Sequence, residues 1–140
     1  MDSETARIEH LKMIQAVVER MGRNSFAIKA GTLTVVVGLL AVAFGINHWT
    51  IAAIGVIPVA ILWGLDAFFI RQERLFRRLY DTIRLGLAPE IGSANYFSMD
   101  TNQVQPEVIG ITRTMFTRTL PVFYIPLLGV LAIISIVLGY

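Results

Sequence analysis

The sequence predicts an all-α membrane protein with three transmembrane helices. Of its 140 residues, 55% are hydrophobic and only 16% are charged. A soluble chain of this length buries too small a fraction of its surface to hide so much apolar area. The apolar residues also fall into three long blocks, each with at most one charged residue. Each block must cross the bilayer as a helix, because lipid offers backbone polar groups no other partner.

Residues 1–25 are predicted to form a cytoplasmic amphipathic helix. Between residues 4 and 22, apolar side chains recur at spacings of three and four, which places them on one helical face. They are Ile8, Leu11, Ile14, Val18 and Met21. Gly22 predicts that this helix stops, and Asn24 or Ser25 is expected to cap the next helix. The acidic, polar start of the sequence predicts no cleavable secretory signal.

We expect the three spans at residues 26–46, 50–70 and 120–140. At about 1.5 Å per residue, a helix of this length covers roughly 30 Å, the thickness of the hydrocarbon core. The first span carries one charge, Lys29, the second carries Asp66, and the third carries none. Residues 47–49 leave room only for a tight helical hairpin. Pro58, in the second span, removes a backbone hydrogen bond and permits a kink.

Residues 71–119 are predicted to form a cytoplasmic helix followed by a connecting segment. The helix, over residues 71–87, continues the second span and is amphipathic. Its arginine face consists of Arg71, Arg74, Arg77, Arg78 and Arg84. Pro89 and Gly92 are expected to end it, after which we expect residues 96–100 to be extended and residues 106–119 to be helical.

The distribution of Lys and Arg predicts the topology. Residues 1–25 carry four of them, residues 71–119 carry seven, and residues 47–49 carry none. The positive-inside rule places both basic segments in the cytoplasm, and the hairpin tip and the C-terminus on the other side. Trp49, Tyr124 and Tyr140 are then expected at span ends, where amphipathic rings prefer to lie.

A stripe of small residues runs along the first span. It consists of Ala27, Gly31, Thr34, Gly38, Ala41 and Gly45, and the second span has Ala53, Ala60, Gly64 and Ala67 at similar spacings. Small residues let helix backbones approach closely, which drives helix association in lipid. The stripe therefore indicates packing between the two spans of one chain, or between copies of the chain. Three short spans hold few internal contacts, so we expect a homo-oligomer.

Lys29 and Asp66 lie at a similar depth near the cytoplasmic ends of their spans. An isolated charge costs about 2.5–3.5 kcal/mol at the centre of a membrane helix and less near its ends, so an ion pair would offset this cost. In an oligomer, the same charges could instead form a ring around an axis. The alternative is that Lys29 extends to the headgroups and Asp66 faces a wet vestibule, each independently.

The sequence holds no constellation typical of an enzyme. The absence of cysteine excludes disulfides, zinc–thiolate sites and a cysteine nucleophile. The two histidines, His10 and His48, are expected on opposite sides of the membrane. Motifs such as H-E-x-x-H, G-x-S-x-G or a phosphate-binding loop do not occur. No catalytic activity, metal or cofactor is therefore expected.

The arginine face supports two interpretations. It could lie on anionic lipid headgroups of the bilayer. It could equally bind an anion or nucleotide, because guanidinium groups match phosphate geometry. In that case Arg113 and Arg118 would add to the site, and aromatic rings could stack on bases. The candidate rings are Phe76, Tyr80, Tyr96 and Phe97.

Several phrases of the sequence resemble a family of short bacterial membrane proteins. They are Asn24-Ser25-Phe26 with Lys29, Leu65-Asp66-Ala67-Phe68-Phe69, Gln72-Glu73-Arg74-Leu75-Phe76-Arg77, Tyr96-Phe97-Ser98-Met99-Asp100-Thr101 and Met115-Phe116-Thr117. In these phrases the chain is similar to the Hailong-type transmembrane effectors of anti-phage systems, which are encoded beside a nucleotidyltransferase.

This resemblance implies a homo-oligomeric ion channel in the bacterial inner membrane, with a periplasmic C-terminus. It implies that an oligonucleotide made by the partner enzyme keeps the channel shut, and that opening arrests the infected cell. The residues alone also fit a non-conducting anchor that docks a cytoplasmic partner. A small transporter subunit is less favoured, because the spans show no pseudo-symmetric repeat.

Overall fold

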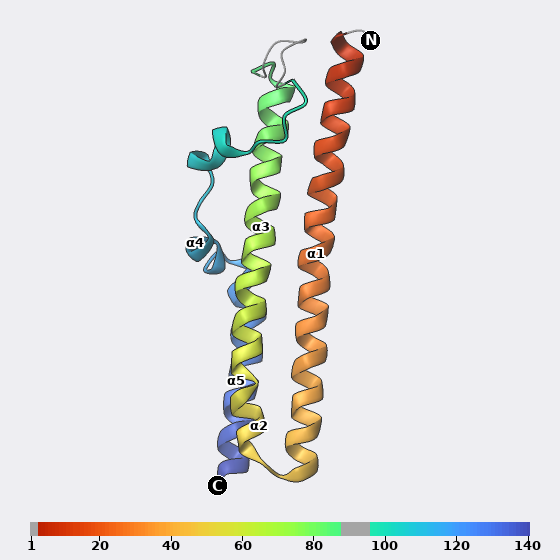
Figure 1. Ribbon diagram of the computed structural model, residues 1–140. Coiled ribbons are helices and arrows are strands. Elements are labelled where there is room, and N and C mark those ends of the chain that lie inside the picture. The colour runs from red at the N-terminus through yellow and green to blue at the C-terminus, as the bar shows by residue number, and fades with distance from the viewer. Residues whose placement is uncertain (1–2, 88–95) are drawn as a thin grey trace.

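The computed structural model of the chain describes residues 3–87 and 96–140, which contain helices and no β-strand (Figure 1). The helices are α1 (Ser3–Ile46), α2 (Trp49–Ile54), α3 (Val56–Arg84), the 3₁₀ helix η1 (Asn102–Glu107), α4 (Ile111–Met115) and α5 (Thr119–Gly139). α1 and α3 lie antiparallel along their whole length, and α5 packs beside the membrane half of α3. Three helical segments, Glu4–Ile46, Trp49–Arg84 and Thr119–Gly139, are long and apolar enough to cross a membrane. This supports the predicted class of an all-helical membrane protein.

α1 is a single helix of 44 residues, so the predicted break at Gly22 and Ser25 is wrong. Ser25 does not cap a helix; its side chain is buried and donates a hydrogen bond to Asp66 on α3. Before Gly22, Ile14 packs in a core with Leu79 and Ile83. Because α1 packs on α3 both before and after Gly22, tertiary contacts outweigh the local preference for a stop.

The second predicted span is present as one helical segment, Trp49–Arg84, in which the hydrogen-bonding pattern is interrupted at Gly55, between α2 and α3. Asn47, at φ 50°, and His48 form the hairpin turn, and α2 begins one residue earlier than expected, at Trp49. The helical hydrogen bonding is interrupted next to Gly55, because Pro58 has no N–H for the Ile54 carbonyl, but Gly55 keeps helical backbone angles of φ −58° and ψ −20°. A Cβ at Gly55 would lie 2.9 Å from Leu39 Cδ1, so α1 approaches closely here and a larger residue would displace the Leu39 side chain.

α3 ends at Arg84, three residues before the predicted end of the helix. Gly86 has φ +76°, and Leu87 N–H donates to the Thr82 carbonyl. This is a Schellman cap, in which glycine supplies the left-handed residue. The expected stop residues Pro89 and Gly92 lie outside the described residues.

The return from α3 to α5 is mostly irregular. Tyr96 and Phe97 form a turn instead of the expected extended start. The helix predicted for residues 106–119 is only partly present: η1 precedes it, and only α4 is α-helical before a break at residues 116–118. α5 matches the third predicted span within one residue.

Two apolar cores hold the helices together. The membrane core contains Val36, Val59, Ala67, Leu120, Tyr124 and Leu131, which come from α1, α3 and α5. The second core contains Ile14, Leu79 and Ile83, from the ends of α1 and α3 that are remote from the hairpin. Asp66 lies within the membrane core, next to Ala67 and in contact with Tyr124.

Candidate functional site

A buried carboxylate joins all three membrane helices. The Asp66 side chain is 0% exposed. Its Oδ2 lies 2.6 Å from Lys29 Nζ on α1 and accepts a hydrogen bond of 3.0 Å from the Tyr124 hydroxyl on α5. Its Oδ1 accepts one of 2.5 Å from Ser25 Oγ. We call Ser25, Lys29, Asp66 and Tyr124 the Asp66 cluster. The predicted pair of Lys29 and Asp66 is therefore present, within one chain.

The geometry of the Asp66 cluster corrects two expectations. Asp66 does not face a wet vestibule, because it is fully buried among three donors. Tyr124 is not an interfacial ring at a span end; it is buried with its hydroxyl on the carboxylate. Lys29 also donates to Ser25 Oγ at 2.8 Å, and its side chain is 21% exposed. Charge compensation and hydrogen bonding together offset the cost of burying the carboxylate.

Trp63 supports the Asp66 cluster from the side. Its ring stacks on Tyr124 with centroids 5.7 Å apart and planes 7° apart. Its indole N–H donates to the Met115 carbonyl at 3.1 Å, and Phe116 meets the ring edge-on. Trp63 thereby fixes Tyr124 and the junction of α4 with α5. The sequence offers one clue to this role, because a tryptophan within an apolar block needs an acceptor for its N–H.

The stripe of small residues on α1 faces away from the other helices. All six of its members are exposed: Ala27, Gly31, Thr34, Gly38, Ala41 and Gly45. A Cβ added at Gly31, Gly38, Gly45 or Gly64 would meet no atom of the described chain within 4 Å. The buried face of the α1 span instead contains Ser25, Thr32, Val36 and Ala43. The interpretation that the stripe packs the first two spans of one chain together is therefore wrong.

Three of the predicted arginines meet at a pocket beside α3. The pocket, of about 350 Å³, is lined by Arg74, Arg77, Arg78, Asp81, Glu107, Val108 and Ile109. We call it the arginine groove. Arg71 lies next to it and donates through Nε to the Ile109 carbonyl at 3.2 Å. Two carboxylates share the lining, so the groove carries only a small positive excess.

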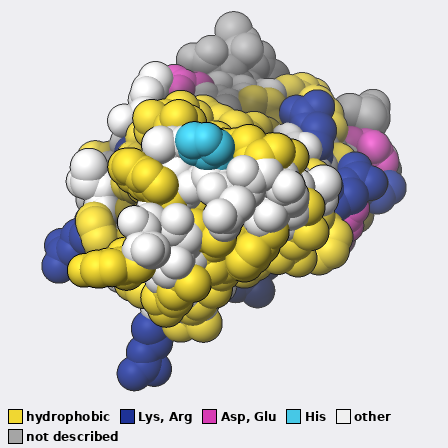
Figure 2. Space-filling view, turned by 90° about the horizontal axis from the view of Figure 1, so that it is seen from below, with side chains coloured by type: hydrophobic (Ala, Val, Ile, Leu, Met, Phe, Trp, Pro, Cys, Tyr) yellow, Lys and Arg dark blue, Asp and Glu magenta, His cyan; other side chains and the backbone are white. Residues whose placement is uncertain are grey.

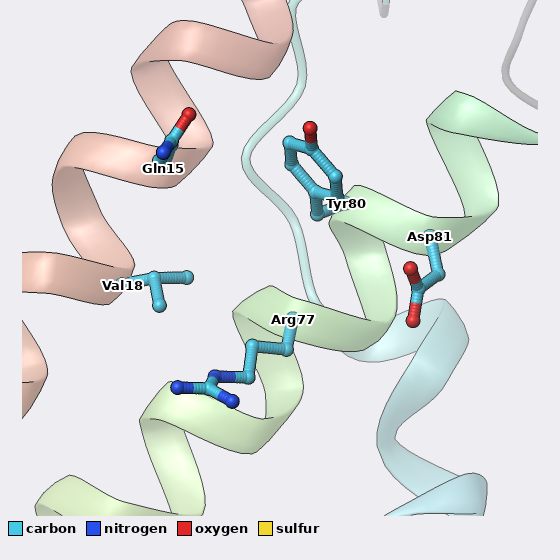
Figure 3. Close-up of a pocket in the computed structure, with 5 residues that line it drawn as sticks. All are labelled: Gln15, Val18, Arg77, Tyr80 and Asp81. Atoms are coloured by element: carbon cyan, nitrogen blue, oxygen red, sulfur yellow. The ribbon is translucent and has the colours of Figure 1, made fainter.

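A second pocket, of about 410 Å³, lies between α1 and α3 (Figure 3). Gln15 and Val18 line it from α1, and Arg77, Tyr80 and Asp81 line it from α3. Arg77 forms an ion pair of 2.6 Å with Glu73 and borders both pockets. Figure 3 shows the Tyr80 ring between the two helices.

The remaining predicted arginines do not line the arginine groove. Arg84 lies 3.8 Å from Asp81 on the exposed end of α3. Arg113 lies on α4, and Arg118 lies between α4 and α5; both are exposed. They are therefore not brought together with the arginine groove, as the anion-site interpretation required.

Most of the aromatic rings predicted to stack on bases pack against other side chains of the protein instead. Tyr96 is buried and, with Phe97, packs around His10. His10 Nε2 lies 3.2 Å from the Ser98 carbonyl. Phe76 and Tyr80 pack on the second core, and of the four rings only Tyr80 lines one of the two described pockets. His10 thus ties the start of α1 to the return segment, a contact over 88 residues that no local pattern signals.

The opposite end of the molecule is nearly free of charge. Figure 2 looks onto the end with the hairpin turn, where the surface is hydrophobic or neutral around a histidine and charged side chains show only at the margin. His48 belongs to this turn, whereas His10 lies near the other end of α1. The described residues contain no group of three metal-ligating side chains.

Comparison with known proteins adds no relative: no family model matches the chain, and no characterised protein or solved structure is significantly similar to it. The fold therefore defines the class, a helical membrane protein with three candidate spans, a buried ion pair within the spans and a basic half beyond one end of them.

Proposed function

We propose that the chain is the subunit of a homo-oligomeric membrane channel, acting as a toxic effector in anti-phage defence. The observation that carries this proposal is the outward-facing stripe of small residues on α1. In lipid, such a surface favours close helix packing with another helix. Since no helix of the same chain covers it in the described structure, a second copy is the natural partner. The resemblance to Hailong-type effectors supplies the defence role.

The arginine groove is the proposed site of the gating signal. Guanidinium groups of Arg74 and Arg78 suit the phosphates of an oligonucleotide. Both residues belong to α3, the helix that carries Asp66 about two to three turns away. A ligand bound at the groove would therefore act directly on the helix that holds the Asp66 cluster. We propose that the bound oligonucleotide holds the channel shut and that its loss opens it.

Current across a planar bilayer tests this proposal. Purified protein should give discrete current steps, and a short single-stranded oligonucleotide on the cytoplasmic side should suppress them. The double variant Arg74→Gln/Arg78→Gln should conduct but resist suppression. Arg84→Gln, outside the groove, is the matched control and should remain sensitive. Equal suppression of all three proteins would remove the groove from the proposal.

A non-conducting anchor is the second candidate, and the Asp66 cluster favours it. Its carboxylate is satisfied by donors of its own chain, so it is sequestered from any central pore. This candidate predicts that protein shown to be inserted and oligomeric gives no current across the bilayer. It also predicts specific co-purification of a cytoplasmic partner through residues 3–25 or the return segment.

A further inference from the structure

Three pairs of arginine and phenylalanine surround the molecule at the cytoplasmic boundary of the spans. They are Arg23 with Phe26 on α1, Arg71 with Phe68 on α3, and Arg113 with Phe116 at α4. Within each pair the residues are three apart, so they lie on the same helical side. The phenylalanine is exposed in each pair: Phe26 is 74% exposed, Phe116 71% and Phe68 39%. We call these six residues the boundary belt.

In every pair the arginine lies on the cytoplasmic side of the phenylalanine. α1 runs from the cytoplasmic half toward the hairpin, and there Arg23 precedes Phe26. α3 runs the other way, and the order is reversed, with Phe68 before Arg71. The chain returns toward the membrane through α4, and Arg113 again precedes Phe116. The sequence order thus follows the direction of the chain across one plane.

Contacts between the helices show that the belt lies at one level. A Cβ at Gly22, next to Arg23, would lie 3.7 Å from Glu73 Oε2 on α3. Arg71 Nε donates to the carbonyl of Ile109, just before α4. The Phe116 ring lies 5.7 Å from Trp63. α5, the third span, begins at Thr119, so this level coincides with the start of the membrane core.

We propose that the boundary belt binds the headgroups of anionic phospholipids and fixes the depth of the protein in the cytoplasmic leaflet. Guanidinium groups would contact headgroup phosphates, and the phenylalanine rings would lie one turn deeper, against glycerol and acyl chains. Neither Arg23 nor Arg113 forms an ion pair within the described part of the chain. Arg71 uses one N–H on a carbonyl and keeps further donors.

The exposed rings distinguish a lipid from a soluble phosphate ligand. A soluble anion needs the arginines but gains nothing from phenylalanines exposed beside them. The neighbouring hydroxyls are occupied, since Thr114 donates to the Gly110 carbonyl and Thr117 to the Thr114 carbonyl. The belt therefore offers charge on one side and apolar surface on the other, which matches a phospholipid at the bilayer surface.

Tryptophan quenching by brominated lipids measures this binding. The chain has two tryptophans, and Trp63 lies beside Phe116 while Trp49 lies at the hairpin end. In a Trp49→Phe chain reconstituted in vesicles, brominated phosphatidylglycerol should quench Trp63 more efficiently than brominated phosphatidylcholine. In a Trp63→Phe chain, Trp49 reports the other leaflet and should show no preference. Equal quenching of Trp63 by both lipids would overturn the proposal.

Substitutions then assign the preference to particular residues. One arginine near an anionic surface contributes up to about fivefold, so Arg23→Gln/Arg113→Gln should reduce the preference severalfold, toward equal binding. Arg84→Gln, which is equally exposed but outside the belt, should preserve it. An equal loss in Arg84→Gln would mean that total charge, and not the belt, attracts the lipid. Glycerol phosphate should not displace the lipid; displacement would assign the arginines to a soluble phosphate and refute the lipid assignment.

Discussion

At the scale of single residues, Asp66 is held by three donors that come from two other segments of the chain. Ser25 and Lys29 reach it from α1, one turn apart, and Tyr124 reaches it from α5. A carboxylate in this position is tolerated only while its partners remain, because removing one side of a buried pair leaves an uncompensated charge or unsatisfied donors. The Asp66 cluster therefore acts as a specific connection between the three spans.

Asp66→Ala should lower the free energy of unfolding by about 3–5 kcal/mol, because it leaves Lys29 and two hydroxyls without their acceptor. Tyr124→Phe removes one hydrogen bond and should cost about 1 kcal/mol. Denaturant titration of the protein in detergent micelles measures both. Asp81→Ala is the control, since its ion pair is long and exposed, and it should cost less than about 1 kcal/mol. An unchanged free energy of unfolding in Asp66→Ala would show that the Asp66 cluster does not stabilise the fold.

The sequence predicted half of this cluster. Lys29 and Asp66 were recognisable because charges are rare in apolar blocks and sat at matching depth. Ser25 was instead interpreted as a helix cap, and Tyr124 as an interfacial ring, because both roles are common for these residues near span ends. Only the three-dimensional approach of α1 and α5 to α3 shows that their hydroxyls have a shared acceptor.

At the scale of elements, the positions of the spans followed from composition, whereas their orientations did not. Periodicity identified the stripe of small residues but could not show whether it faces another helix of the same chain. Ser25, Thr32 and Val36 occupy the intramolecular face instead. Likewise, Gly22 signalled a stop that packing on both sides of it overrides, and Pro58 interrupts the hydrogen bonding of its helix while the backbone at Gly55 stays helical.

Gly38→Leu should weaken self-association without disturbing the fold of one chain. Its Cβ position is free of contacts in the described chain, so leucine fits there but prevents close approach of another helix. We expect the concentration for half-assembly to rise tenfold or more, equivalent to about 1.4 kcal/mol. Analytical ultracentrifugation in detergent measures this value. Val37→Leu, exposed on a neighbouring face, should leave assembly unchanged. Unaltered assembly in both variants would mean that the stripe faces lipid.

At the scale of the whole molecule, charge is concentrated in one half. The half that contains Ser3 and Arg84 holds the basic segments, and the hairpin end shows almost no charge (Figure 2). Net charge is only +2, so its distribution, and not its sum, determines the orientation in the membrane.

Thiol labelling tests this orientation, and any label must lie on the introduced residue because the chain contains no cysteine of its own. A membrane-impermeant maleimide should label His48→Cys in intact cells and Gln103→Cys only after lysis. Both positions are exposed, so accessibility depends on the side of the membrane and not on burial. The reverse pattern would invert the topology and move the arginine groove out of the cytoplasm.

The unbroken length of α1 has a mechanical consequence. The helix is held to α3 at three levels: by Ile14, which packs with Leu79 and Ile83, by the ion pair of Lys29 with Asp66, and by Val36 in the membrane core. From Lys29, about 39 Å of helix extends toward Ser3 and about 26 Å toward Ile46. With no break in α1 to absorb a displacement, a movement imposed near Ser3 reaches the hairpin only when α3 moves with α1, so the two helices transmit it as one unit.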